Sequence, residues 1–194
     1  MNTRLANKVF LVGLMGSGKT TIGQLLAKRL GLQFVDADHE LEKRTGVSIA
    51  TIFEIEGEAA FRSREATLID ELTMREGIVL GTGGGAILHA DSRAALKTRG
   101  DTFYLHSSPE TSFERLRRNR DRPLLLVSDP LSKLRQLYES RHSLYLDTAH
   151  FIVESYRDRP SAVAAEIESM LSTRRQSESA LPTVTFEQHS DSVL

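Results

Sequence analysis

The stretch Gly13-Leu-Met-Gly-Ser-Gly-Lys19-Thr20 decides the fold of this 194-residue chain. It has the pattern G-x-x-x-x-G-K-[ST], in which the glycines let backbone N–H groups point inward at phosphate oxygens. The lysine ammonium reaches the β- and γ-phosphates of a nucleotide, and the threonine hydroxyl is a hard oxygen ligand for Mg²⁺. The residues predicted to bind ATP here are Gly16, Ser17, Gly18, Lys19, Thr20 and Thr21.

The residues on either side of this motif have the pattern that a phosphate-binding loop requires. The apolar run 9–12 precedes it and predicts a buried parallel strand. After it, Ile22 and Leu26 fall at helical spacing, and Gly31 predicts the end of that helix. A helix that begins near Lys19 directs the positive end of its dipole at a bound anion. The motif alone leaves kinases, GTPases and other ATPases open, although an N-K-x-D guanine-binding motif does not occur.

Predicted strands and helices alternate along most of the chain. Apolar runs that predict strands occur at 9–12, 33–36, 78–80, 102–105 and 151–153. Helical patterns stand between them, with Ser48 and Ser108 as predicted N-caps and Gly57 as a predicted break. This alternation predicts the α/β class, as a three-layer P-loop NTPase fold with a central parallel sheet of about five strands and helices on both faces. Ligands of such folds bind at the carboxyl ends of the strands.

The composition indicates one globular domain followed by a tail. Hydrophobic residues make up 40% and charged residues 26% of the chain, which is typical of a globular protein. The net charge of -1 does not favour electrostatic attraction to nucleic acid or to a membrane. The absence of cysteine excludes disulfides and a thiolate zinc site. We expect a phosphate-loop domain over 1–171, with a mobile lid at about 115–130, and a disordered tail over 172–194. No apolar stretch approaches the ~20 residues that span a bilayer, so we expect a cytoplasmic protein.

Two acids, Asp36 and Asp38, stand at the end of the second predicted strand. Alternate residues of a strand share a face, so both carboxylates are expected to point into the same cleft. One would support the magnesium shell, and the other would accept a proton or a hydrogen bond from an acceptor hydroxyl. The alternative is a plain acidic turn that leads into the next helix.

Arg62 and the glycine run 83–85 are candidates for the acceptor side of the site. Arg62 follows Phe61 on a predicted helix and is able to clamp a carboxylate, although surface arginines on helices are common. Three consecutive glycines after a strand weaken local structure, which indicates a close approach of the backbone to a ligand. A flexible turn is the alternative for these glycines.

Together these residues resemble the shikimate kinase family, and the resemblance spans residues 8–171. The segments that carry it are 13–21 (GLMGSGKTT), 36–38 (DAD), 52–62 (IFEIEGEAAFR), 81–86 (GTGGGA), 122–125 (RPLL) and 141–145 (RHSLY). The first segment alone is generic, whereas the others in this order and spacing are close to diagnostic. The family transfers the γ-phosphate of ATP to the 3-hydroxyl of shikimate, on the route to chorismate and the aromatic amino acids.

The resemblance implies a role for each matching residue. Asp38 would bind the substrate hydroxyls and is the candidate general base, assisted in catalysis by Lys19 and Arg122. Thr20 and Asp36 would serve the Mg²⁺ that accompanies ATP. The implied shikimate contacts are Asp38, Arg62, Gly83, Gly84, Gly85, Arg141, Phe53 and Phe61. The implied partners are these two small molecules, without nucleic acid or membrane, and the enzyme is expected to be a monomer.

Five arginines lie within residues 115–122, with prolines beyond them. Kinases close a flap over their substrates to exclude water, and a cationic segment suits that flap. Arg117 and Arg122 are its predicted ATP contacts, with Arg117 matched to a family arginine near the adenine. The competing interpretation is a nucleic-acid patch, which the lack of interleaved aromatic residues and the near-zero net charge disfavour.

Two rival functions stay open at this stage. A gluconate or nucleoside-monophosphate kinase would share the fold and the lid, but the acidic pair, the glycine run and Arg141 argue against those acceptors. A nucleotide-binding regulatory module without turnover would not need Lys19, Asp38 and Arg122 together. The six histidines show no metal-ligand spacing, and we expect packing or solvated roles for them.

Overall fold

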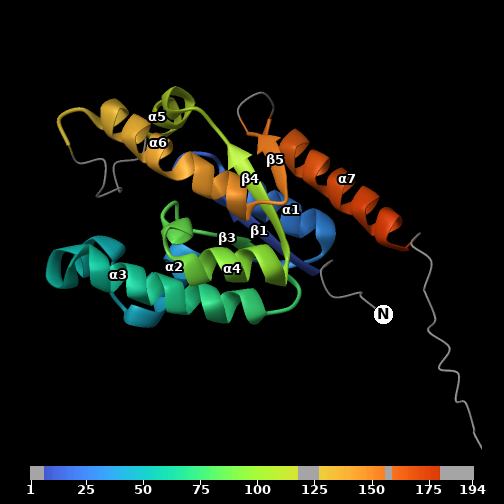
Figure 1. Cartoon of the computed structure of the whole chain (residues 1–194), viewed down its shortest axis with the longest axis horizontal. Helices are drawn as coiled ribbons and strands as arrows, with labels where there is room; N and C mark the ends of the chain where they lie inside the picture. The colour runs from blue at the N-terminus through green and yellow to red at the C-terminus, as the bar shows by residue number, and fades with distance from the viewer. Residues whose placement is uncertain (1–6, 118–126, 156–158, 180–194) are drawn as a thin grey trace, which may run out of the picture.

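The computed structural model describes residues 7–117, 127–155 and 159–179, which form a layered α/β structure around one sheet (Figure 1). The sheet has five parallel strands in the order β2-β3-β1-β4-β5. Their bounds are Lys8–Val12 (β1), Gln33–Asp36 (β2), Ile78–Gly81 (β3), Asp101–His106 (β4) and Phe151–Glu154 (β5). The predicted α/β class and the five-stranded parallel sheet are therefore confirmed.

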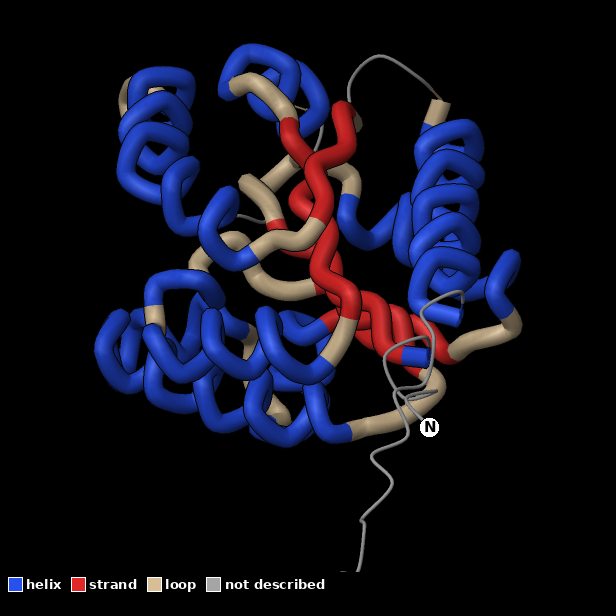
Figure 2. Tube along the Cα trace, turned by 45° about the vertical axis from the view of Figure 1, so that its right-hand side comes forward, coloured by secondary structure: helices blue, strands red, loops and turns tan. Residues whose placement is uncertain are grey.

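Helices cover both faces of the sheet (Figure 2). One face carries α1 (Lys19–Leu30) and α7 (Pro160–Ser179), which pack against each other. The other face carries α2 (Ala37–Thr45), α3 (Ile49–Met74), α4 (Ala90–Arg99) and α6 (Pro130–Thr148), with a short 3-10 turn at Ala86–Leu88. The remaining helix, α5 (Pro109–Leu116), packs on α6 through a small apolar cluster that also includes Leu14 and Met15 of the phosphate loop.

Successive side chains of the strands point alternately into two separate hydrophobic cores. In β1, Phe10 and Val12 belong to the core under α3, α4 and α6, whereas Val9 and Leu11 belong to the core under α1 and α7. This follows from strand geometry, in which successive side chains point to opposite faces. Because both faces are covered by helices, every residue of β1 is buried, as expected of a central parallel strand.

The helix boundaries largely follow local sequence signals. The Ser48 hydroxyl caps α3 by accepting a hydrogen bond of 3.1 Å from the Thr51 N–H. Gly57 breaks the same helix, with φ 82° and ψ 174°, a conformation that only glycine adopts without strain. Both features agree with the sequence prediction. The break lets the two halves of α3 run in different directions over the edge of the sheet.

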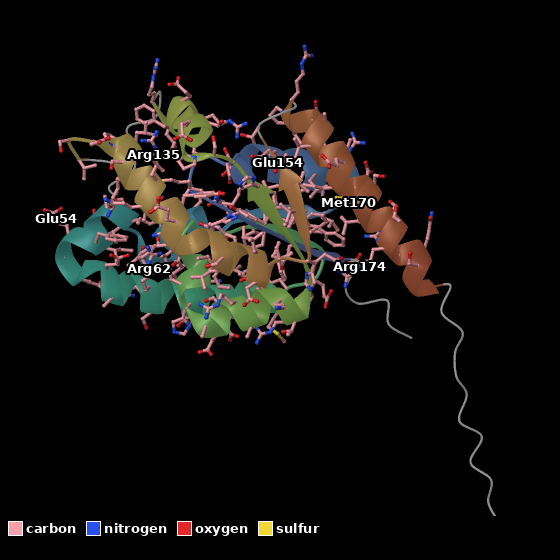
Figure 3. All side chains as sticks on the ribbon, turned by 45° about the horizontal axis from the view of Figure 1, so that its top comes forward. Glu54, Arg62, Arg135, Glu154, Met170 and Arg174 are labelled. Atoms are coloured by element: carbon pink, nitrogen blue, oxygen red, sulfur yellow. The ribbon has the colours of Figure 1, made fainter. Side chains whose placement is uncertain are left out.

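The last helix ends later than the sequence pattern predicts. We expected helix to Leu171 and a tail beyond it, but α7 continues to Ser179. Arg174 lies on this extension (Figure 3). It forms an ion pair of 2.6 Å with Asp101 at the start of β4, and its guanidinium lies over the Phe151 ring. Side chains that reach back to the sheet hold the extension in place. Residues 180–194, the rest of the predicted tail, lie outside the described part of the chain.

Within the described ranges, no helix is both long and apolar enough to cross a membrane.

Candidate active site

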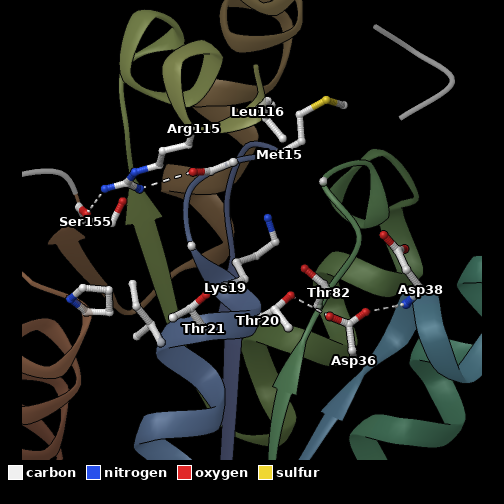
Figure 4. A pocket seen from close by; sticks show the side chains of 15 residues that line it. Met15, Lys19, Thr20, Thr21, Asp36, Asp38, Thr82, Arg115, Leu116 and Ser155 are labelled. Atoms are coloured by element: carbon white, nitrogen blue, oxygen red, sulfur yellow. Dashed lines mark hydrogen bonds between the residues drawn. The ribbon is translucent and has the colours of Figure 1, made fainter. Parts of the chain in front are cut away.

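A cavity of about 450 Å³ opens at the carboxyl ends of the strands (Figure 4). Its walls come from the phosphate loop and the start of α1, from the β2 and β3 ends, from α5, and from the segment after β5. The lining residues are Met15, Gly16, Gly18, Lys19, Thr20, Thr21, Ile22, Asp36, Asp38, Thr82, Gly84, Arg115, Leu116, Ser155 and Pro160. Most of the predicted ATP-binding residues, both acids and Gly84 therefore meet in one place.

The phosphate loop holds Lys19 by its own backbone. The Lys19 ammonium donates to the carbonyls of Gly13 and Leu14 at 2.7 and 2.9 Å, and lies 3.4 Å from the Ser17 hydroxyl. The helix that begins at this lysine has no acidic residue in its first turn. Its positive dipole end and the ammonium therefore act together on any anion in the loop.

Thr20 and Asp36 form the oxygen pair beside the loop. The Thr20 hydroxyl donates to the Asp36 carboxylate at 2.8 Å, joining the start of α1 to the end of β2 (Figure 4). The other Asp36 oxygen caps α2 by accepting from the N–H groups of Asp38 and His39 at 3.1 and 3.3 Å. Asp36 thus carries a structural task in addition to its predicted place in the magnesium shell.

The placement of Asp38 corrects the strand geometry expected from the sequence. Strand β2 ends at Asp36, and Asp38 belongs to the first turn of α2, so the two carboxylates do not share a strand face. The cap formed by Asp36 is the reason, because it turns the chain into a helix at once. Both residues still line the cavity, since the N-terminus of α2 faces it.

The glycine run 83–85 is required by close packing around its backbone. A Cβ atom at Gly83 would overlap the Glu65 carboxylate and would lie 2.7 Å from the Asp38 Oδ1. A Cβ atom at Gly85 would overlap the Arg62 guanidinium. None of the three glycines has a positive φ, so space and not backbone conformation demands glycine here. The glycines are therefore needed for packing against side chains of the protein, and the predicted approach of this backbone to a ligand stays a prediction.

Arg62 and Glu65 lie one turn apart on α3 beside this run. The Arg62 guanidinium donates to Glu65 at 2.7 Å and to Glu58 at 3.1 Å. Burial raises the pKa of the Glu65 carboxyl, and Asp38 adds to this effect, whereas Arg62 opposes it. The Glu65 Oε1 is buried without a hydrogen-bond partner among the described residues. Sequence analysis missed Glu65, although its spacing of three from Arg62 in a helix could have indicated it.

Arg141 and Tyr145 approach the glycine run from the opposite element, α6. Arg141 donates to the Gly84 carbonyl at 3.1 Å, and the Tyr145 hydroxyl donates to the same oxygen at 2.5 Å. Both side chains are buried. Arg62 and Arg141 do not line the cavity themselves and adjoin it through Gly84 and Gly85.

Phe53 and Phe61 lie together across the break in α3. Their ring centroids are 4.6 Å apart, and Arg62 lies 5.0 Å from the Phe61 centroid. Phe61 is buried in the core, while Phe53 is half-buried against it. The two rings therefore form an apolar wall next to Arg62.

The arginine over the phosphate loop is Arg115, not Arg117. The Arg115 guanidinium donates to the carbonyls of Gly16 at 3.2 Å and Ser155 at 2.6 Å, and burial lowers its pKa (Figure 4). Arg117 is exposed and pairs with Glu114. Arg117 stands two positions later, at the C-cap of α5, so the two side chains point to different faces. Arg122 and the rest of segment 118–126 of the predicted lid lie outside the described residues.

These contacts join a nucleotide-phosphate loop, through the glycine run, to a cluster of arginines and acids. A fold and site of this kind define a P-loop phosphotransferase that acts on a small anionic acceptor. Comparison makes the class specific, because residues 15–172 match the model of the shikimate kinase family. The chain belongs to the shikimate kinase family.

Individual relatives agree with this membership. A shikimate kinase from Thiobacillus denitrificans is 54% identical over 151 residues, which is 78% of this chain and 82% of the relative. The solved shikimate kinase from Acinetobacter baumannii in complex with shikimate is 44% identical and has a TM-score of 0.85, covering 87% of this chain and 94% of its own. A gluconokinase from Sinorhizobium meliloti, 16% identical with a TM-score of 0.55, shares the fold alone.

Proposed function

We propose that this chain transfers the γ-phosphate of ATP to the 3-hydroxyl of shikimate, giving shikimate 3-phosphate and ADP. The observation that carries the proposal is the meeting of two half-sites in one place. Lys19, Thr20 and Asp38 line one cavity together with Gly84. Gly84 contacts Arg141, and the next residue, Gly85, packs against Arg62. The donor half suits a nucleotide triphosphate, and the acceptor half suits a polyol that carries a carboxylate.

Asp38 is the proposed general base. It lies in the cavity on the first turn of α2, close to Gly83. A carboxylate there accepts hydrogen bonds from substrate hydroxyls and takes the proton of the attacking one as the bond to phosphorus forms.

Arg62 and Arg141 are the proposed clamp for the substrate carboxylate. An arginine fork matches a carboxylate in two parallel hydrogen bonds, which orient the ring of the acceptor as well as bind it. The acids Glu58 and Glu65 hold the Arg62 fork before substrate arrives. The Phe53 and Phe61 rings would then cover an apolar side of the substrate.

The Thr20 hydroxyl and the Asp36 carboxylate fit the Mg²⁺ that accompanies ATP. They are two hard oxygen donors already 2.8 Å apart at the phosphate loop. Mg²⁺ is typically bound by one or two protein oxygens together with phosphate oxygens and water. When bound, the ion neutralises charge on the phosphates. Lys19 performs the same task from the loop, and Arg122 from the lid is proposed to add to it.

Arg115 is proposed to contact the nucleotide base in place of Arg117. Its guanidinium bridges the phosphate loop and the segment after β5, and Pro160 lines the same part of the cavity. A planar guanidinium stacks well on an aromatic base.

We also propose that the enzyme is a monomer in the cytoplasm, as the sequence predicts. Light scattering of the purified protein measures its mass in solution.

Release of ADP with separate acceptors tests the proposed function. Purified protein with ATP and Mg²⁺ should release ADP at least about 100-fold faster with shikimate than with gluconate or AMP. Mass spectrometry should find one phosphate added to shikimate. Stimulation by gluconate or AMP, without stimulation by shikimate, would overturn the proposal.

A further inference from the structure

Gly84 is the point at which the two halves of the site touch. A Cβ atom on Gly84 would lie 3.3 Å from the Met15 N and 3.6 Å from the Gly13 O, both in the phosphate loop. On its other side, the Gly84 carbonyl accepts hydrogen bonds from Arg141 and Tyr145 of α6. The peptide that follows Gly84 is therefore held between the phosphate loop and one helix.

The two donors occupy one face of α6 because they are four residues apart. Arg141 is proposed for the substrate clamp, so its guanidinium would also bind a carboxylate. Tyr145 has no such second task. It is completely buried, its ring stacks on Tyr104 at 4.9 Å, and burial raises its pKa, so its hydroxyl stays protonated and donates.

The peptide between Gly84 and Gly85 is trans, as are all described peptide bonds. The carbonyl of Gly84 and the N–H of Gly85 therefore point in opposite directions within one rigid plane. A hydrogen bond that holds the carbonyl toward α6 consequently directs the Gly85 N–H away from α6. The Arg62 guanidinium lies directly beside Gly85. The Gly85 N–H and the guanidinium beside the same residue are two donors within reach of one anionic group.

We infer that Tyr145 is a positioning residue of the acceptor site, which sets the Gly84–Gly85 peptide so that its N–H meets the substrate carboxylate. The inference rests on the proposed function for the identity of the substrate. The hydroxyl of Tyr145 acts through the backbone and does not touch the substrate. Its loss would leave Arg141, which is also proposed to bind the substrate carboxylate, as the remaining donor to the carbonyl, and the peptide would be held less firmly.

The substitution Tyr145→Phe removes this hydroxyl and keeps the ring. The matched control is Tyr104→Phe, which removes a hydroxyl from the adjacent stacked ring. The Tyr104 hydroxyl bonds to His142 at 3.0 Å and not to the glycine run. We expect Tyr145→Phe to raise the KM for shikimate about fivefold, with kcat and the KM for ATP within twofold, as one lost hydrogen bond implies. Tyr104→Phe should leave all three constants within twofold.

A second measurement does not depend on which acceptor the enzyme uses. Amide hydrogen exchange of the ligand-free protein, followed by NMR, should show at least about tenfold faster exchange at Gly85 in Tyr145→Phe than in the unaltered chain. The Leu88 N–H, which donates to the Gly85 carbonyl at 2.9 Å, serves as the internal reference within the same turn.

The outcomes separate the two proposals. A normal Gly85 exchange rate in Tyr145→Phe, or a KM increase no larger than in Tyr104→Phe, would overturn the role of Tyr145. Failure of the unaltered protein to phosphorylate shikimate would overturn the proposed function instead, and the exchange rates would still decide whether Tyr145 positions the peptide. A loss of thermal stability shared equally by both variants, without the KM effect, would show a structural role only.

Discussion

The Arg62 guanidinium and the Glu65 carboxylate are joined across one turn of α3 by a hydrogen bond of 2.7 Å. Gly83 and Gly85 pass directly against these two side chains, with no space for a side chain of their own. A buried acid with a raised pKa, a fixed arginine and a bare stretch of backbone thus stand within one small volume next to Asp38. This packing would hold the proposed acceptor half of the site in place before any ligand binds.

Asp38→Asn should lower kcat at least about 100-fold, because an amide cannot take the proton of the attacking hydroxyl. ATP binding should change less than twofold, since Asp38 stands on the acceptor side. Steady-state ADP release and calorimetric titration with ATP measure the two effects. Glu40→Gln is the control on the same helix, where the carboxylate pairs with Arg44 and Arg75, and it should leave kcat intact. Near-normal turnover of Asp38→Asn would remove the proposed base.

Arg62→Lys should raise the KM for shikimate about tenfold while kcat changes less than threefold. The ammonium keeps the charge but loses the planar fork that matches a carboxylate. Arg64→Lys is the matched control, because Arg64 lies on the same helix and pairs with the exposed Glu56. Initial rates at varied shikimate give both constants. An equal KM in the two variants would contradict the clamp.

Arg174→Ala should destabilise the fold by about 3 kcal/mol, because it removes a guanidinium that lies 2.6 Å from the buried Asp101 carboxylate. The Asp101 side chain is only 4% exposed. Arg29→Ala is the control: Arg29 lies on α1 and forms an exposed ion pair with Glu168 of α7. Loss of this pair should lower the free energy of unfolding by less than about 1 kcal/mol. Urea unfolding followed by circular dichroism measures both. A loss below about 1 kcal/mol in Arg174→Ala would contradict a stabilising role of this ion pair.

We expect the free energy of unfolding to depend on pH through the protonation of His150. Burial, followed by the charges of Arg174 and Lys97, lowers the pKa of this imidazole, whose Nδ1 accepts from the Thr102 N–H at 3.1 Å. In the interval between the lowered pKa and the ordinary value of about 6.5, the unfolded chain binds more protons than the folded chain. The stability that neutral His150 contributes is therefore present above that interval and is lost as the pH falls through it.

His150→Asn supplies an acceptor that does not titrate in this range. Its free energy of unfolding should vary less than that of the unaltered chain over the same pH interval, measured by urea unfolding at closely spaced pH values. Parallel curves for the two proteins would assign the pH dependence to other groups.

The parallel sheet, the phosphate loop and the break in α3 could be predicted because each depends on residues close together in the chain. A strand followed by glycines and Lys19 has few alternative structures, and Gly57 adopts its φ of 82° for a local steric reason. The resemblance of the separate motifs to the shikimate kinase family likewise predicted most of the residues that lie together around the cavity and the glycine run.

Other features depend on which surfaces pack together. Asp38 lies in a helix and not in the expected strand because Asp36 caps α2. Arg115, and not Arg117, faces the phosphate loop because of the rotation of α5. Tyr145 reaches the Gly84 carbonyl across 61 residues of sequence, and no local pattern records such a contact. The sequence by itself determined the fold and the phosphate loop, since short-range sterics and periodicity specify them. Only the tertiary structure decided which side chains hold the glycine run, since that follows from how α3 and α6 pack around the sheet.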